Sequence, residues 1–168
     1  DNSYTESLLT VSSRAVDNTD MGECNAGFMR SEAMLHIIMV SDEPEQSPSS
    51  WSSYVNAIIA KKGNAANVRM SAIAGDVPYG CSSAEAGTGY ADAVDATNGV
   101  FLSICSDWAN ANNLELLAEA SVQQNTFSLS HEAVEETIVV LINGEAVDGD
   151  DWYYDAALNT VVFVDGAP

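Results

Sequence analysis

Basic residues are scarce in this 168-residue sequence. It contains 5 Lys and Arg residues against 25 Asp and Glu residues, which gives a formal net charge of −20 at pH 7. Nucleic-acid binding and adhesion to anionic lipid both require a Lys/Arg patch, so we expect neither among the partners. The excess of acid suits a medium rich in salt or divalent cations, where self-repulsion is screened, and simple solubility is the alternative interpretation.

Several motifs that identify whole classes of protein are also missing. No apolar run reaches about 18 residues, so we expect no membrane insertion, and no signal peptide is recognisable. A G-x-S-x-G elbow and a phosphate-binding loop are absent, and Gly87-Thr88-Gly89 lacks the third glycine of a dinucleotide fingerprint. We therefore expect no enzyme. Because Asp1 is not an initiator methionine, we expect a mature, processed or partial chain.

Cysteine is rare as well. The three cysteines, Cys24, Cys81 and Cys105, lie far apart, and none forms a C-x-x-C pair. Their spacing argues against structural zinc and against thioredoxin-like redox chemistry. The odd number leaves one cysteine free or paired with another chain.

The most informative stretch that is present covers residues 34–48, MLHIIMVSDEPEQSP. Its uninterrupted apolar run, 35–40, is typical of a strand buried on both faces of a parallel sheet, and Pro44 cannot continue such a strand. Asp42 follows directly, at the end of the strand where open α/β sheets place their ligands. The pattern predicts an acidic rim that suits a hard cation, Mg²⁺ or Ca²⁺.

Helical and strand patterns alternate along the first 125 residues. Helical spacing appears in 1–16, 51–62, 90–97 and 108–122, and apolar strand patterns appear in 35–40, 68–74 and 100–105. This alternation predicts an α/β fold, a partial doubly wound and mostly parallel sheet with right-handed crossovers and flanking helices.

The ends of the predicted helices carry capping signals. Ser3 or Thr5 could cap the first helix, Ser50 the second, and Ser106 or Asp107 the last. The second helix also has Lys61 and Lys62 in its last turn and Gly63 as a stop. Its apolar stripe, which we interpret as core, comprises Trp51, Tyr54, Val55, Ile58 and Ile59.

The tail has a different character. Residues 137–143, TIVVLIN, are rich in β-branched side chains, and Asn143-Gly144 is typical of a hairpin turn. We expect two domains, an α/β domain over residues 1–125 and a small antiparallel β unit over residues 126–168. The aromatic run 152–154 either packs this unit or presents a patch to a partner, and we favour packing.

Four segments together resemble a known family. They are NAGFMRSEAMLHIIMVSDEPEQSP (25–48), SAIAGD (71–76), GYADAVDATNGVFLSICSDW (89–108) and a tail containing IVVLINGEAV and NTVVFV. The chain is similar, over nearly its whole length, to the later part of the von Willebrand factor type A-like domain of bacterial surface and secreted proteins. This resemblance implies a Rossmann-like sheet that carries a metal-ion-dependent adhesion site on three loops.

The resemblance assigns residues to two of those loops. Asp42 matches the third-loop aspartate, and Thr5 is the best match for the second-loop threonine. Separately from the resemblance, we expect Ser41 and Glu43 to support the metal from outside its coordination sphere; a serine that only satisfies backbone groups and a solvated acid are the alternatives. The first-loop motif, Asp-x-Ser-x-Ser, is absent, and its nearest imitation is residues 17–21. The resemblance then implies that the first strand and its ligands lie upstream or on another chain, so that strand 35–41 has an open neighbouring edge. Asp42 as a plain loop acid and Thr5 as a plain helix cap are the alternatives.

The cysteines gain an interpretation from the same resemblance. Cys81 follows the ligand end of the second strand and Cys105 closes the third, so both lie at one edge of the sheet, and the resemblance supports a disulfide between them. Two buried thiols in a reducing compartment remain the alternative. Closing a loop of about 24 residues would contribute roughly 3–3.5 kcal/mol.

Three functional hypotheses follow. The first is a non-enzymatic, extracellular or cell-surface adhesion module that binds a protein or glycan ligand through its acidic group and a cation. The second is a structural assembly subunit, joined to another chain through the open sheet edge and the β tail. The third is a hydrolase that uses His36, Asp42 and Glu43, although a histidine inside an apolar run is more often a hydrogen-bonded core residue.

Overall fold

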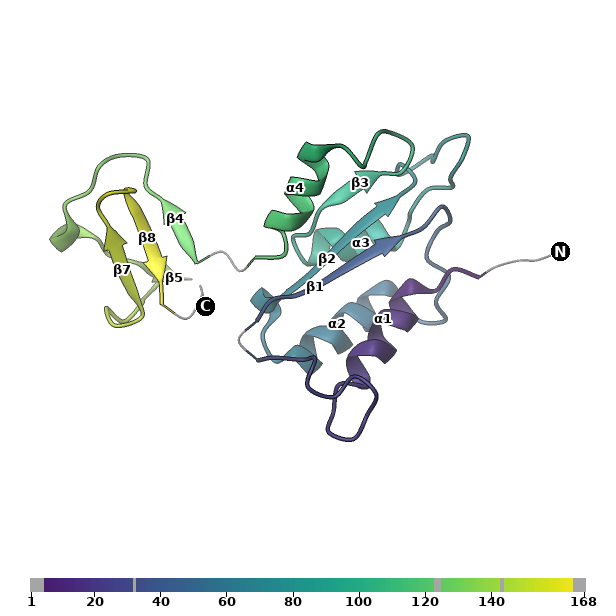
Figure 1. The fold of residues 1–168 in the computed structure, drawn as a ribbon, viewed down its shortest axis with the longest axis horizontal. Helices are drawn as coiled ribbons and strands as arrows, with labels where there is room; N and C mark the ends of the chain where they lie inside the picture. Colours follow the sequence, from purple (N-terminus) through teal and green to yellow (C-terminus); the bar gives the residue numbers. More distant parts are fainter. Residues whose placement is uncertain (1–4, 32, 123–124, 143, 165–168) are drawn as a thin grey trace. The chain divides into compact units, whose positions relative to one another are not determined.

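The chain divides into two compact units, residues 1–122 and 123–168 (Figure 1). The computed structural model describes residues 5–31, 33–122, 125–142 and 144–164. Among these residues, no helix combines the length and the apolar character that crossing a membrane requires.

The first unit is built on a three-stranded parallel sheet (Figure 1). Its strands are β1 (Leu35–Val40), β2 (Val68–Ala74) and β3 (Phe101–Ser103), in the order β1-β2-β3. The prediction of a mixed α/β fold with a parallel sheet is therefore confirmed. The register places His36 opposite Arg69.

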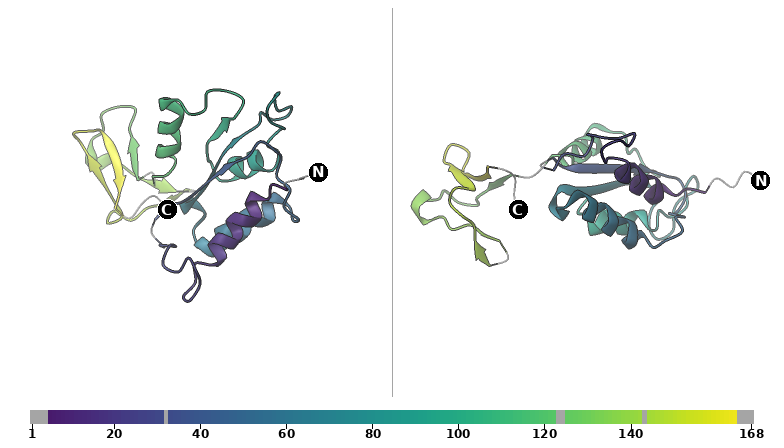
Figure 2. Two further views of the ribbon diagram at one scale, coloured as in Figure 1. Left: turned by 45° about the vertical axis from the view of Figure 1, so that its right-hand side comes forward. Right: turned by 90° about the horizontal axis from the view of Figure 1, so that it is seen from below.

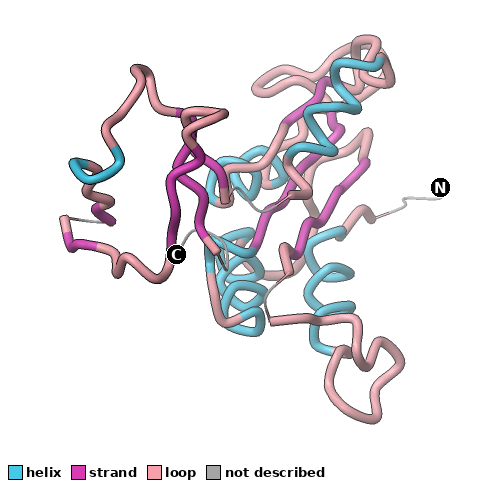
Figure 3. Tube along the Cα trace, turned by 60° about the vertical axis from the view of Figure 1, so that its left-hand side comes forward, coloured by secondary structure: helices cyan, strands magenta, loops and turns pink. Residues whose placement is uncertain are grey.

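Helices cover the two faces of this sheet unequally (Figures 2 and 3). One face carries α1 (Leu8–Asp17), α2 (Trp51–Lys62) and α3 (Tyr90–Ala96), whereas α4 (Ala111–Glu119) packs on the other. Two short 3₁₀ turns, η1 (Ala65–Asn67) and η2 (Glu135–Thr137), complete the helical segments described.

The main hydrophobic core lies between the sheet and the first three helices. It includes Leu9 of α1, Met39 of β1, Ile58 of α2, Met70 of β2 and Tyr90 of α3. The opposite face has a smaller cluster, in which Ile73 of β2 and Leu102 of β3 contact Leu117 of α4. The apolar stripe of α2 belongs to the core as predicted, and its side chains contribute to or pack against the main cluster.

The prediction that strand 35–40 is buried on both faces is wrong. Leu35 and Met39 are buried, but Ile38 is 47% exposed and Val40 is 52% exposed. Side chains alternate across a strand, so these two residues lie on the face that carries α4. That helix packs over β2 and β3 and leaves Ile38 and Val40 of β1 exposed.

The outer edge of β1 is open. Within the described residues, β1 pairs with β2 alone. The Ser41 N–H donates to the Ile73 carbonyl oxygen on β2 (3.1 Å). The alternation of the backbone then turns the peptide groups of Ile38 and Val40 toward the free edge.

Helix caps were predicted correctly for α2 and wrongly for α1 and α4. Ser50 accepts from the Ser53 N–H (3.3 Å), and Gly63 adopts a left-handed conformation with φ 85°. The residue before α1 is Ser7, which makes no side-chain cap. The cap of α4 is Asn110, which accepts from the Asn113 N–H, so the helix begins later than Ser106 or Asp107 would require.

The third strand is shorter than the predicted 100–105. After Ser103 the chain turns, because the Cys105 N–H donates to Ser103 Oγ (3.2 Å) and the Ser106 hydroxyl donates to the Ser103 carbonyl oxygen (3.1 Å). A serine side chain that competes for backbone groups is a common reason for a strand to end early.

The second unit is a small antiparallel β structure. Strands β4 (Thr126–Ser128), β8 (Thr160–Phe163) and β7 (Trp152–Asp155) form one sheet in that order, and Phe127 meets Phe163 edge to face, with ring centroids 5.7 Å apart. Strands β5 (Leu141–Ile142) and β6 (Glu145–Ala146) form a hairpin at the predicted turn. Gly144 has φ 88°, while Asn143 lies outside the described residues.

The apolar run 137–143 does not form one long strand. Thr137 ends η2, and regular pairing begins at Leu141. Val139 is 70% exposed and Leu141 is 58% exposed, whereas Ile138, Val140 and Ile142 are partly buried, so alternate side chains of this run are exposed to solvent. In the aromatic run, Trp152 is half-buried and Tyr153 is 53% exposed, so only part of it packs within the unit.

Candidate functional site

The loop after β1 contacts the segment that leads into α1. Ser41 is buried, and its hydroxyl donates to the Glu6 carboxylate while accepting the backbone N–H of Glu43 (3.1 Å). Two stretches about 35 residues apart in sequence thus meet at the carboxyl end of the sheet. We call this region, formed by Glu6, Ser41, Asp42 and Glu45, the carboxyl-end rim.

A cavity of about 320 Å³ opens on this rim. Asp42 and Glu6 line it together with Ser41 and Ser83. The Asp42 side chain is exposed, and its backbone carbonyl accepts from the Glu85 N–H (2.8 Å), which ties the loop to the segment after β2. Carboxylate and hydroxyl oxygens are the donors that Mg²⁺ and Ca²⁺ prefer.

The ligand set on the rim is small. No group of three or more His, Cys, Asp or Glu side chains within the described stretches is arranged to hold a metal ion. Ca²⁺ takes about six to eight oxygen ligands, and Mg²⁺ takes about six, several of them water. The two carboxylates that line the cavity could hold a cation tightly only with further oxygens from water, a ligand or another polypeptide.

Glu6 is the rim residue that sequence reasoning missed. Thr5 is exposed, and the carboxylate that reaches Ser41 belongs to its neighbour. Glu43 is half-buried and accepts from the Gln46 side-chain amide (2.6 Å). The signal available in the sequence was an acid beside Thr5, just ahead of a predicted helix.

Glu45 has a structural role that its sequence context did not reveal. Its carboxylate accepts from the Leu9 N–H (2.9 Å) in the first turn of α1 and from the Ser47 N–H (2.6 Å). An acid placed there satisfies an unpaired helix N–H and complements the helix dipole. Gly89, with φ 85°, allows Glu45 to lie close to the backbone at the start of α3, since a Cβ at position 89 would lie 2.7 Å from the Glu45 Cβ.

Tyr90 is a buried phenol beneath the rim. Its hydroxyl lies 3.5 Å from the Glu6 carbonyl oxygen. Burial, together with the negative charge of Glu45, raises the pKa of Tyr90 to about 12. This phenol stays protonated at any physiological pH and acts as a packing and donor group.

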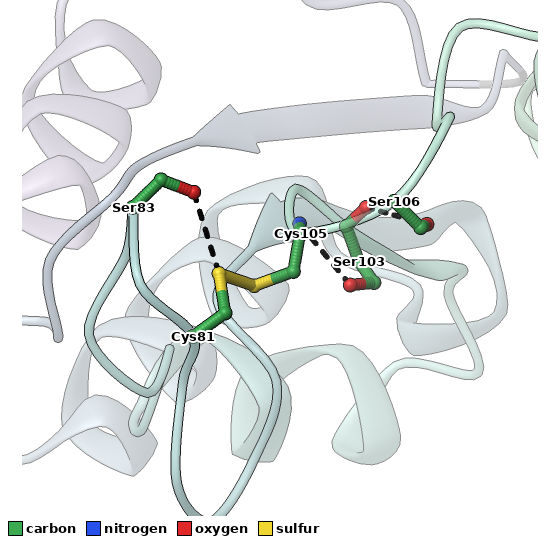
Figure 4. The surroundings of a disulfide bond; sticks show 5 residues. All are labelled: Cys81, Ser83, Ser103, Cys105 and Ser106. Atoms are coloured by element: carbon green, nitrogen blue, oxygen red, sulfur yellow. Dashed lines mark hydrogen bonds between the residues drawn. A yellow bond between two sulfur atoms is a disulfide. The ribbon is translucent and has the colours of Figure 1, made fainter.

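A disulfide joins Cys81 to Cys105 near the carboxyl ends of β2 and β3 (Figure 4). The Cα atoms lie 6.1 Å apart, and Ser83 Oγ is 3.4 Å from Cys81 Sγ. The predicted pairing is confirmed, and Cys24 is an exposed free thiol. The bridge ties the loop that supplies Ser83 to the turn after β3.

His36 lies at the opposite end of β1. Its Nδ1 is 2.6 Å from Ser121 Oγ, and its Nε2 is 2.7 Å from the hydroxyl of the fully buried Ser71. Ser121 donates to the Leu117 carbonyl oxygen, so we assign the His36 proton to Nδ1. Burial, and then the charge of Arg69, lowers the pKa of His36 and favours its neutral form.

The residues of the hydrolase hypothesis are not brought together. His36 and Asp42 are six positions apart on one extended strand and its exit, a separation of roughly 20 Å. His36 already has a hydroxyl partner at each ring nitrogen. His131, the other histidine, is exposed beside Ser130.

Comparisons with protein-family models, curated proteins and solved structures found no match to this chain.

Proposed function

We propose that this protein is a non-enzymatic binding module of the von Willebrand A-like kind, which recognises a protein or glycan ligand through a divalent cation at the carboxyl-end rim. The observation that carries the proposal is the contact between Ser41 and Glu6. It brings the loop before α1 beside the loop after β1, and the lining of one cavity by Glu6 and Asp42 supports a shared site there.

Three further features support this proposal. The rim cavity is lined by oxygen donors suited to a hard cation. An acidic group of the ligand would supply coordination that the rim lacks, as would oxygens from a strand beside β1. The disulfide fits an oxidising compartment, in agreement with an extracellular or cell-surface location.

Calorimetric titration with Mg²⁺ and Ca²⁺ at 0.15 M salt tests the cation site. We expect one site with a dissociation constant on the order of 10⁻⁴–10⁻³ M, a range typical of extracellular calcium modules. Asp42→Asn should abolish the binding, because it replaces a charged cavity oxygen with a neutral amide. Asp95→Asn, at an exposed position on α3, makes the same change away from the rim and should bind as the original chain does.

The comparison of Asp42→Asn with Asp95→Asn distinguishes a specific rim site from non-specific cation binding. Equal cation binding by Asp42→Asn and Asp95→Asn would assign the binding to the diffuse charge of the acidic surface and would refute a rim site. The cation affinities of Thr5→Ala and Glu6→Gln then show how much each of these two residues contributes. The proposed site requires that at least one of the two substitutions weakens cation binding.

The open edge of β1 favours a second candidate, a subunit that assembles by adding a strand to the sheet. A cavity of about 360 Å³ lies between α1 and β1, lined by Val11, Phe28, Leu35 and Ile37 among others. Val11 is 61% exposed and Phe28 is 70% exposed. An unpaired strand beside an apolar groove is the usual acceptor for strand addition.

Sedimentation of the chain over a concentration series tests this assembly. If copies of the chain pair through β1, Ile38→Lys should shift the population to monomer by placing a charge beside the free edge. Leu158→Lys, at an exposed apolar position in the second unit, is the matched control and should leave the distribution unchanged. Identical behaviour of the two variants would count against pairing through β1.

A further inference from the structure

A cavity of about 420 Å³ lies at the amino end of the sheet, at the opposite end of β1 from the rim. Residues 27–30 and 33–36 form most of its wall, and Lys62 and Ser121 complete it. The wall is mixed: Phe28, Met29 and Leu35 supply apolar surface, and Arg30 supplies a guanidinium group. We call this hollow the amino-end cavity.

Basic residues concentrate around this cavity in a chain that has 5 of them in total. Arg30 and Lys62 line it. Arg69 lies opposite His36 in the β1–β2 register, and therefore on the same face of the sheet, where its charge acts on the imidazole. Such a concentration produces a local positive potential on a molecule whose net charge is −20.

Arg30 and Arg69 have no acidic partner within the part of the chain that the structure describes. Across the described residues, the ion pair present is Lys61 with Asp20 (2.6 Å), and neither the Arg30 nor the Arg69 guanidinium makes a hydrogen bond. The Arg69 Nε is buried and unsatisfied. A guanidinium partly removed from water, as in Arg69, normally requires a compensating acceptor, and no acidic side chain among the described residues provides one.

The neighbouring groups are held in place. The Lys62 ammonium donates to the backbone carbonyl oxygens of Arg30 and Ser31 (2.8 Å to Ser31), which fixes the backbone that carries Arg30 to the end of α2. His36 is held between Ser71 and Ser121 and so forms a fixed part of the wall. The cavity is therefore largely preformed.

We propose that the amino-end cavity binds a small molecule that carries an oxyanion group, a carboxylate, sulfate or phosphate, on an apolar body. The guanidinium fork of Arg30 would receive the oxyanion, Arg69 would reinforce it electrostatically, and the apolar wall would take the body of the ligand. The volume lies in the range of small-molecule sites, about 300–1,000 Å³. This site is separate from the proposed cation rim and does not depend on it.

Titration of the whole chain with phenyl phosphate, followed calorimetrically at constant ionic strength and with EDTA present, tests the proposal. We expect saturable binding that Arg30→Gln weakens by about tenfold or more, because a charge-assisted bidentate contact is lost. Arg14→Gln removes an exposed arginine of α1 instead and should leave the affinity unchanged. Because Arg30 is exposed, its replacement does not endanger folding.

Two further probes separate the contributions of charge and apolar body. Inorganic phosphate should bind more weakly than phenyl phosphate, and benzyl alcohol, which lacks the anion, should not bind detectably. The proposal is overturned if Arg30→Gln and Arg14→Gln bind phenyl phosphate equally, or if benzyl alcohol binds as well as phenyl phosphate. Asp42→Asn should bind phenyl phosphate normally, so failure of the cation site and failure of this site are distinguishable.

Discussion

The two ends of the parallel sheet differ in charge and in the bonds that hold them. The carboxyl end gathers Glu6, Asp42 and Glu45 and is crosslinked by the Cys81–Cys105 disulfide. At the amino end, Arg30 and Lys62 line a cavity, and a chain of hydrogen bonds through His36 joins β1, β2 and Ser121, just after the end of α4.

This difference shows how a parallel sheet can place residues of opposite charge at its two ends. All three strands run in one direction, so residues that follow strands meet at one end and residues that precede them meet at the other. A separation of roughly 20 Å, the length of β1, exceeds the Debye length at physiological salt, about 8 Å, so the two ends act independently through water. One small unit can therefore present an acidic rim and a basic cavity together.

Of the changes that test this difference between the two ends of the sheet, removing the Cys81–Cys105 disulfide should have the largest effect on stability. The double variant Cys81→Ser, Cys105→Ser opens a loop with a sequence separation of 24 residues, and we expect it to lower the free energy of unfolding by about 3 kcal/mol. Urea unfolding followed by circular dichroism measures the loss. Cys24→Ser, which removes the free thiol, is the control. If both variants unfold at the same urea concentration, the bridge contributes nothing to the carboxyl end.

A smaller effect is expected from the acid that caps α1. Glu45→Ala removes the acceptor for the Leu9 and Ser47 N–H groups, and we expect a loss of about 1 kcal/mol, as for other helix caps. Glu45→Gln keeps one acceptor oxygen without the charge, so its free energy of unfolding should lie between those of the original chain and Glu45→Ala. The same urea assay ranks the three proteins. An unchanged midpoint for Glu45→Ala would show that water replaces the carboxylate at no cost.

The smallest effect concerns the amino end and depends on pH. The pKa of His36 is lower in the folded protein than its ordinary value of 6.5, so the unfolded chain binds the proton more readily. The stability contributed by neutral His36 is complete above pH 6.5 and decreases as the pH falls below that value.

Urea midpoints measured between pH 8 and pH 5.5 test this pH dependence. The decrease should be shallower in His36→Gln than in the original chain, whereas His131→Gln should follow the original chain. The same slope in both variants would mean that carboxylates alone govern the acid side of the stability profile.

The features that local sequence specified were predicted well. Ser50, the α2 apolar stripe and Gly63 define a helix through contacts within a few residues, and the alternation of elements predicted the parallel sheet. The disulfide also followed, because its two cysteines close neighbouring strands of one sheet.

Features that depend on distant neighbours were predicted poorly. The exposure of Ile38 and Val40 reflects which strand and helix stand beside β1, and an apolar run carries no information about that. Glu6 and Glu45 gain their roles from segments about 35 residues away. Arg30 precedes β1 and Arg69 lies near the start of β2, so the parallel pairing of these strands brings both to one end of the sheet, and no local pattern relates them.

The open flank of β1 has a consequence for how the molecule behaves in concentrated solution. An exposed strand edge with apolar side chains promotes stacking of like chains, and here each copy carries a charge of −20. The Debye length, which sets the range of the Coulomb repulsion between copies, is about 10 Å at 0.1 M salt but only about 3 Å at 1 M. Colloidal stability should therefore fall in brine even where the fold is intact, and a polypeptide that occupies the flank would restore it.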